Sequence, residues 1–131
     1  MKLFLAFLIA LVWVPAFAQY NNDKAVSPAA EKQNISKLLK NHSAIKAAFK
    51  KNPKDAKLKK KYVDSNVALG MQYTYSNTVD RKQKYRIALG YFNEALKYDP
   101  KNKDATETRN LIVSIYRSMG RPVPGESGKG G

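Results

Sequence analysis

One pattern occurs twice in this chain and favours helical folds. The segments AAFKKNPKDA at 47–56 and EALKYDPKNKDA at 94–105 each place an alanine and a bulky apolar residue before a lysine, then reach a proline and a second alanine. Proline stops a helix because it lacks a backbone N–H and its ring clashes with the preceding turn. Pro53 and Pro100 are 47 residues apart, a length that accommodates a pair of helices. The repeated pattern therefore predicts helical hairpins.

The spacing of apolar residues predicts an all-α fold with five helices and no strand. Apolar side chains recur every three or four positions, the period of one helix face. The expected helices are 28–40, a short helix between Ser43 and Pro53, 56–75, 83–98, and a last helix from Asp104 to Gly120. Asn41-His42-Ser43 is interpreted as the turn between the first two. In the last helix the expected buried residues are Leu111, Ile112, Ile115, Tyr116 and Met119.

Both ends of the chain are expected to lie outside this helical domain, which spans 28–120. An apolar run from Leu3 to Val14 follows Lys2 and precedes Ala16-Phe17-Ala18, which is typical of a cleaved secretory signal over 1–18. The run is shorter than the roughly 20 residues that span a bilayer. Residues 19–27 are predicted to be a flexible arm and 121–131 a disordered tail. We expect an exported protein, periplasmic or secreted, of a bacterial envelope.

Composition narrows the chemistry that the chain can perform. It has no cysteine and a single histidine, His42, which we expect to be solvated in its turn. There is no cysteine nucleophile, no second histidine for a metal, and no well-placed base for a serine triad. Asp55 and Asp104 are better explained as helix caps than as catalytic acids. We therefore expect no enzyme, no cofactor and no metal.

Two short motifs resemble the tetratricopeptide repeat family. Leu69-Gly70-x-x-Tyr73 is similar to the family's first helix, and Ala88-x-x-x-Phe92-x-x-Ala95 followed by Pro100 is similar to its second helix and turn. The chain departs from the family at Asn66, where tryptophan is usual, and in its longer linker between the two helices. The resemblance implies helix-turn-helix repeats stacked as a short α-solenoid.

The same residues have a direct packing interpretation. Gly70, Ala88 and Ala95 remove side-chain bulk where two helices approach, while Tyr73 and Phe92 fill the space between them. These aromatic residues are expected in the core rather than around a cofactor.

The resemblance implies a non-catalytic scaffold that binds a partner protein or peptide on the concave face formed by first helices. The residues carried over to that face are Val67, Met71, Tyr75, Arg109, Val113 and Arg117. Arginine, methionine and tyrosine are enriched in protein interfaces. A second interpretation is that Met71 and Tyr75 simply pack beneath the loop at 76–82, and it stays open here.

The alternative function rests on charge, since the chain carries a net +14. Four lysines, Lys57, Lys59, Lys60 and Lys61, are expected to form an anion-binding patch for anionic polymers or lipid headgroups. A solvated helix face explains the same run equally well. Export argues against nucleic acid as the physiological partner. Self-association is a third hypothesis, because stacked repeats need about three units to bury a continuous core.

Overall fold

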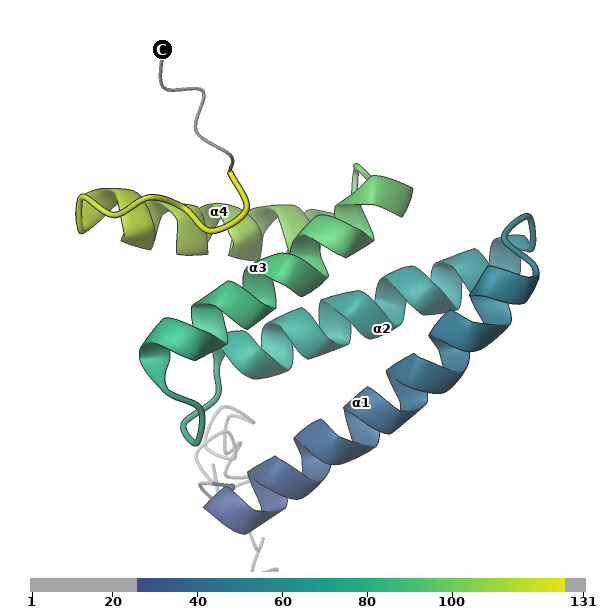
Figure 1. Ribbon diagram of the computed structural model, residues 1–131, viewed down its shortest axis with the longest axis horizontal. Coiled ribbons are helices and arrows are strands. Elements are labelled where there is room, and N and C mark those ends of the chain that lie inside the picture. The colour runs from purple at the N-terminus through teal and green to yellow at the C-terminus, as the bar shows by residue number, and fades with distance from the viewer. Residues whose placement is uncertain (1–25, 127–131) are drawn as a thin grey trace, which may run out of the picture.

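The structure is a computed structural model that describes residues 26–126 (Figure 1). Its regular elements are the helices α1 (Pro28–Lys51), α2 (Ala56–Thr74), α3 (Arg81–Tyr98) and α4 (Lys103–Ser118). The all-α prediction is confirmed, and residues 26–126 contain no strand. The expected signal at 1–18, most of the expected arm, and residues 127–131 lie outside the described residues.

Each helix begins at a side chain that caps its first turn. The capping oxygens belong to Ser27, Asp55, Asp80 and Asn102, and each accepts a hydrogen bond from a backbone N–H two or three residues later. A cap of this kind contributes about 1 kcal/mol. The cap expected at Asp104 is wrong, because α4 starts at Asn102 and Asp104 lies within its first turn.

The helix α1 continues without a break through the turn expected at 41–43, so two predicted helices are one. His42 is buried there at 8% exposure, in line with Ile35 and Phe49, which lie seven residues before and after it. Residues seven apart share a helix face. The prediction of a solvated His42 is therefore wrong: tertiary packing overrides the turn preference of its polar neighbours.

The closest approach in the fold is between α2 and α3. A Cβ placed on Gly70 would lie 2.6 Å from Cε1 of Phe92, whose side chain is fully buried. Ala88 and Ala95 on α3 are also fully buried. The packing expected for these four residues is confirmed, since a larger residue at 70 would push the ring of Phe92 out of place.

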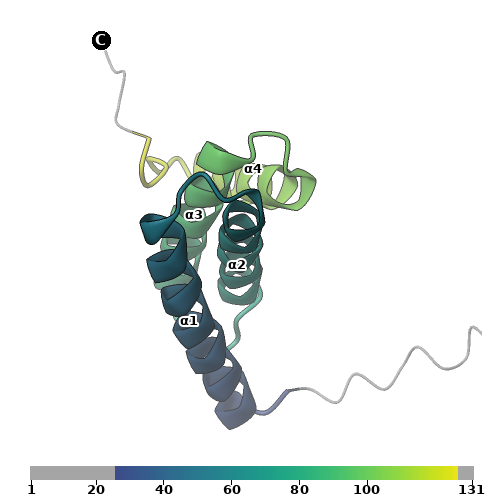
Figure 2. The ribbon, with the colours of Figure 1, turned by 90° about the vertical axis from the view of Figure 1, so that its right-hand side faces the viewer.

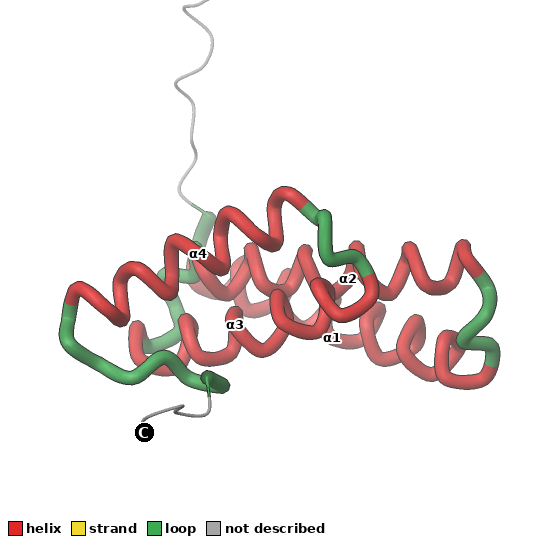
Figure 3. The backbone as a smooth tube through the Cα atoms, turned by 90° about the horizontal axis from the view of Figure 1, so that it is seen from above, coloured by secondary structure: helices red, strands yellow, loops and turns green. Residues whose placement is uncertain are grey.

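Successive helices run in opposite directions, and alternate helices share a side. Figures 2 and 3 show α1 and α3 on one side and α2 and α4 on the other. The helices that pack directly on each other are α1 with α2, α2 with α3, α3 with α4, and α2 with α4, whereas the backbones of α1 and α3 stay apart. Any contact between α1 and α3 is therefore made by side chains.

A buried carboxylate holds the loop between α2 and α3. Glu31 of α1, 6% exposed, accepts hydrogen bonds from the hydroxyls of Ser76 and Thr78 and from the backbone N–H groups of Asn77 and Thr78. These bonds, that of Ser76 foremost, lower the pKa of Glu31 although burial opposes them. The loop is thus longer than a tight turn and yet tethered to α1.

The buried face of α4 is rotated from the predicted one. Ile112 and Tyr116 are buried as expected, but Leu111 and Met119 are half exposed at 49% and 50%, and Val113 is buried in their place. Gly120 ends the helix as expected, with φ of +63°, a conformation that glycine adopts without strain.

The first residues after α4 also correct a prediction. Residues 121–126 were expected in a disordered tail, but Val123 is buried among the core residues of α3 and α4. Glu126 forms ion pairs with Arg109 at 3.3 Å and with Arg117 at 3.7 Å. This segment covers the side of α4 that carries Val113, which explains the rotation of the buried face.

Candidate functional site

The residues of α2 that were expected to bind a partner are only partly accessible. Val67 and Met71 pack against the core, and the sulfur of Met71 lies 3.3 Å from the Thr108 hydroxyl, which donates to it. Tyr75 is 62% exposed at the end of the helix. Met71 therefore belongs mainly to the α2–α4 contact.

The three residues of α4 that were expected to bind the same partner face a different direction from those of α2. Arg109 donates to the Asn93 side chain at 2.7 Å, and together with Arg117 it holds Glu126. Val113 is 5% exposed, so its assignment to a binding surface is wrong. These residues face α3 and the C-terminal segment, and the structure does not bring the six expected residues onto one face.

The four lysines expected to bind anions are all exposed on α2. Lys60 forms an ion pair with Asp64 at 2.7 Å, one turn along the helix, and the other three lysines form no ion pair within the described residues. An exposed pair of this kind contributes well under 1 kcal/mol. Most of the positive charge on this face is therefore available to an outside group.

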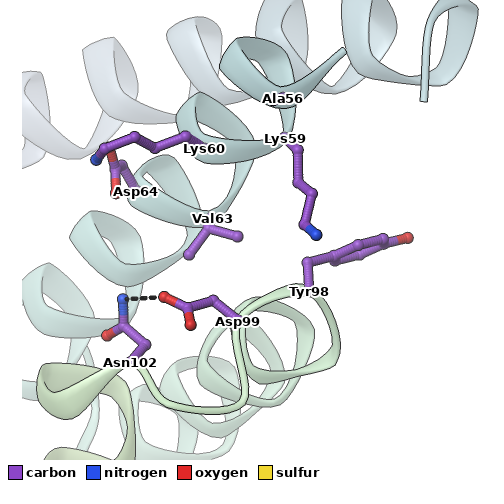
Figure 4. Close-up of a pocket in the computed structure, with 8 residues that line it drawn as sticks. All are labelled: Ala56, Lys59, Lys60, Val63, Asp64, Tyr98, Asp99 and Asn102. Carbon is purple, nitrogen blue, oxygen red and sulfur yellow. Dashed lines mark hydrogen bonds and ion pairs between the residues drawn. The ribbon is translucent and has the colours of Figure 1, made fainter. Parts of the chain in front are cut away.

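Lys59 and Lys60 also line a cleft between α2 and the α3–α4 turn, here named the turn cleft (Figure 4). Its volume is about 430 Å³. Val63 forms an apolar floor, and Lys59 extends toward the ring of Tyr98 on the facing wall. Asp99, which accepts from the Asn102 amide at 3.2 Å, adds a negative charge. The cleft thus combines an apolar surface, an aromatic ring and charges of both signs.

A second cleft, the α1–α3 cleft, lies between those two helices and has a volume of about 450 Å³. A cluster of aromatic rings from α1, α2 and α3 connects α1 to α3. The ring of His42 stacks on Tyr62 with centroids 5.5 Å apart and meets Tyr91 edge to face at 5.6 Å. Phe49 and Tyr98 extend the cluster toward the α1–α2 turn. This cluster, and not direct helix packing, joins α1 to α3.

Burial, hydrogen bonds and nearby charges together shift the pKa values of this cluster. The Tyr62 hydroxyl donates to Glu94 at 3.0 Å, and burial, followed by this carboxylate, raises the pKa of Tyr62 to about 12. Lys97 donates to the other oxygen of Glu94 at 2.8 Å and is the main cause of the lowered pKa of that carboxyl. Burial, followed by the charge of Lys46, lowers the pKa of His42. His42 is therefore neutral and Glu94 ionised at neutral pH.

Sequence reasoning missed the α1–α3 cleft because it placed His42 in a turn. The sequence did contain an indication of it. Ile35, His42 and Phe49 are seven residues apart, a spacing that places them on one face of a helix that continues through 41–43 without a turn. Asn66, the position at which the chain departs from the tetratricopeptide pattern, is buried and donates to the Tyr62 carbonyl at 2.8 Å.

Residues 26–126 contain no group of three or more histidine, cysteine, aspartate or glutamate side chains placed to hold a metal ion. Within the same range, none of the helices combines the length and the hydrophobicity needed to cross a bilayer.

Comparison with known proteins gives a limited similarity. No protein-family model matches the chain, and no solved structure matches it. The chain is similar to a (-)-germacrene D synthase of Origanum vulgare, with 27% identity over 118 residues. The alignment covers 86% of this chain and 19% of the synthase, so the chain spans about a fifth of the length of that relative. The function is therefore argued from the geometry of the clefts.

Proposed function

We propose that this protein is a non-catalytic interaction module that binds a partner protein or peptide in the turn cleft, between α2 and the α3–α4 turn. The observation that carries the proposal is the turn cleft, where an apolar floor, an aromatic wall and charges of both signs lie together. That combination suits a polypeptide, which offers apolar side chains, amide groups and both charges. The proposed binding residues are therefore Lys59, Val63, Tyr98 and Asp99, in place of the six residues expected from the sequence.

The alternating arrangement of the helices supports a tetratricopeptide-like interpretation. The pair α2–α3 carries the small-residue contact of Gly70 with Phe92, and α4 lies beside α2 as a following first helix would. In a stack of this kind the first helices form the concave binding side. The proposed setting is the cell envelope, on the grounds of the signal-like segment at 1–18 alone.

The test is affinity capture from an envelope extract of the source cell, with Lys59→Glu and Lys57→Glu as a matched pair. Both lysines are exposed on α2 and both changes reverse one charge, but only Lys59 lines the turn cleft. The proposal expects a defined protein that survives a high-salt wash, is lost with Lys59→Glu and is retained with Lys57→Glu. Equal retention by both variants would place the partner elsewhere.

The exposure of the four lysines favours a second candidate function, the binding of anionic polymers or lipid headgroups. Binding through several lysines falls steeply with ionic strength, because each contact releases counterions. Vesicles with and without phosphatidylglycerol test this function. It predicts that Lys57→Glu and Lys59→Glu weaken binding to the anionic vesicles equally, and that high salt releases the protein from them.

Self-association remains a proposal of its own. The exposed Leu111 and Met119 on α4 are the apolar residues that a second copy would cover. The mass of the protein in solution decides it, and a monomer at all concentrations would exclude it.

A further inference from the structure

His42 is buried, yet one of its ring nitrogens makes no hydrogen bond to any residue within 26–126. Its Nδ1 lies 2.9 Å from the Ser65 hydroxyl, and that hydroxyl donates its one proton to the Tyr62 carbonyl, also at 2.9 Å. Ser65 must therefore accept from His42, which places the imidazole proton on Nδ1. The neutral ring then carries a lone pair on Nε2.

The α1–α3 cleft gives access to this lone pair. Within the described residues Nε2 makes no hydrogen bond, and no fully enclosed side-chain nitrogen or oxygen there lacks a partner. Nε2 is consequently not sealed in the core, and the ring lines the cleft. A hydrogen-bond donor entering the cleft would find an acceptor held in place by Ser65 and by the stacked ring of Tyr62.

The cleft also carries more positive than negative charge. Lys46 from α1 and Arg86 from α3 line it, and neither forms an ion pair within residues 26–126. The carboxylate in the cleft is that of Glu94, and its two oxygens already accept from Tyr62 and Lys97. Lys46 also acts on the Glu94 carboxylate through space and lowers its pKa, but with Arg86 the cleft keeps an excess of positive charge, which favours an anionic ligand.

The aromatic rings restrict what kind of anion fits. Tyr62 stacks on both His42 and Phe49, and Tyr91 stacks on Tyr73 with centroids 5.9 Å apart. Because Tyr62 has a stacking partner on each side and Tyr91 has one of its own, these rings offer little surface on which a sugar ring or a nucleobase could stack. A small charged group that enters between the cations fits better.

We propose that the α1–α3 cleft binds an acidic residue of a peptide, with Lys46 and Arg86 contacting its carboxylate and His42 Nε2 accepting a backbone N–H of the same segment. A peptide brings the anion and the N–H donor together, whereas a free inorganic anion would meet the lone pair of Nε2. The site goes beyond the proposed function, because it lies on a different face of α2 from the turn cleft and uses none of the residues that line the turn cleft.

A substitution at Gly90 is the most direct way to block the α1–α3 cleft. It lies in the middle of α3, lines the cleft, and a Cβ placed on it would meet nothing within 4 Å. A larger side chain would therefore project into the cleft without touching the core. Because glycine is a poor helix former, Gly90→Leu also strengthens α3 locally.

The experiment uses the single histidine of the chain, whose imidazole resonances report the cleft directly in NMR spectra. The probes are the capped peptide acetyl-Ala-Glu-Ala-Glu-Ala-amide and its glutamine analogue. We expect the glutamate peptide to shift the His42 resonances and the glutamine peptide to leave them in place. Arg86→Ala and Lys46→Ala should each weaken binding about tenfold, the loss of one charge-assisted contact. The exposed Lys101→Ala, which removes the same charge elsewhere, should not.

Gly90→Leu should abolish the shift while circular dichroism shows an unchanged helix content. Equal binding by both peptides, or binding that survives both Gly90→Leu and Arg86→Ala, would overturn the proposal. Lys59→Glu separates the two sites, because it should disrupt the turn cleft and leave the His42 shift intact.

Discussion

The helix α2 has two interfaces of opposite character. Toward α3 and α4 the buried side chains are mainly apolar, with Phe92, Ala95 and Ile112 fully excluded from solvent, and the buried Thr108 donates to the sulfur of Met71. Toward α1 they include a series of polar groups, namely Glu31, His42, Ser65, Asn66 and Ser76. Within residues 26–126 every enclosed side-chain nitrogen and oxygen has a partner.

The difference teaches how each interface specifies its geometry. Apolar contacts are non-directional, so the α2–α3 interface depends on shape, above all on the space that Gly70 leaves for Phe92. Hydrogen bonds are directional, and an unpaired buried group costs about 1–3 kcal/mol. The polar interface therefore fixes the register of α1 on α2 through its bonding pattern.

The largest effect is expected from Phe92→Ala, which empties the centre of the apolar interface. A cavity left by a fully buried aromatic ring costs about 3–5 kcal/mol. Urea unfolding measures the loss, and Leu111→Ala, at a half-exposed position, is the control with a far smaller change. A loss as small as that of the control would show that α3 can collapse into the space.

Overpacking the same interface should cost less. Gly70→Ala places a Cβ within 3 Å of the Phe92 ring, and such strain costs about 1–3 kcal/mol. Its matched control is Gly90→Ala, the same change at an open helical position, which should stabilise the protein by up to about 1 kcal/mol. Thermal unfolding of the two variants should give shifts of opposite sign, and shifts of the same sign would contradict the close approach.

The polar interface should respond to Glu31→Gln, which keeps the shape and removes the charge that holds the loop. We expect a loss of about 1–3 kcal/mol at pH 7. Since the folded state lowers the pKa of Glu31, its contribution is fully present above the ordinary value of 4.5 and is lost as the pH falls through the lowered pKa. The difference between the two proteins should therefore shrink in acid. Asp64→Asn, at an exposed ion pair, should show no comparable change.

The smallest effect concerns His42. An NMR pH series should give His42 a pKa below the ordinary 6.5, because burial and the nearby charge of Lys46 disfavour the imidazolium. Stability from the neutral ring is then present above pH 6.5 and decreases as the pH falls through the lowered pKa. Replacement by glutamine should remove this part of the pH dependence. An unperturbed titration would place the ring in solvent, as the turn interpretation had it.

The sequence predicted those parts of the fold that depend on neighbours in the chain or on strong apolar spacing. The end of a helix before Pro53, the cap at Asp55, the extent of α2, and the glycine that ends α4 were all anticipated. The contact between Gly70 and Phe92 was also anticipated, because small and bulky residues at helical spacing identify a close crossing.

The parts that were missed depend on distant partners. His42 was assigned to a turn because its bonding partner, Ser65, lies 23 residues away, and local polarity gave no hint of it. Val113 was expected on the surface because the segment that covers its side of α4, residues 121–126, was expected to be disordered. The candidate binding residues of α4 failed for the same reason.

By itself, then, the sequence determined the helices and their main apolar interface, since capping, proline and helical periodicity act within a few residues. Only the tertiary structure decided which polar side chains are buried. Glu31 meets its partners 45–47 residues later in the chain, and a group of this kind is buried only where distant donors converge on it. The same convergence brings His42 and Lys46 of α1 together with Arg86 of α3, and so creates a cleft between two helices that are not neighbours in the sequence.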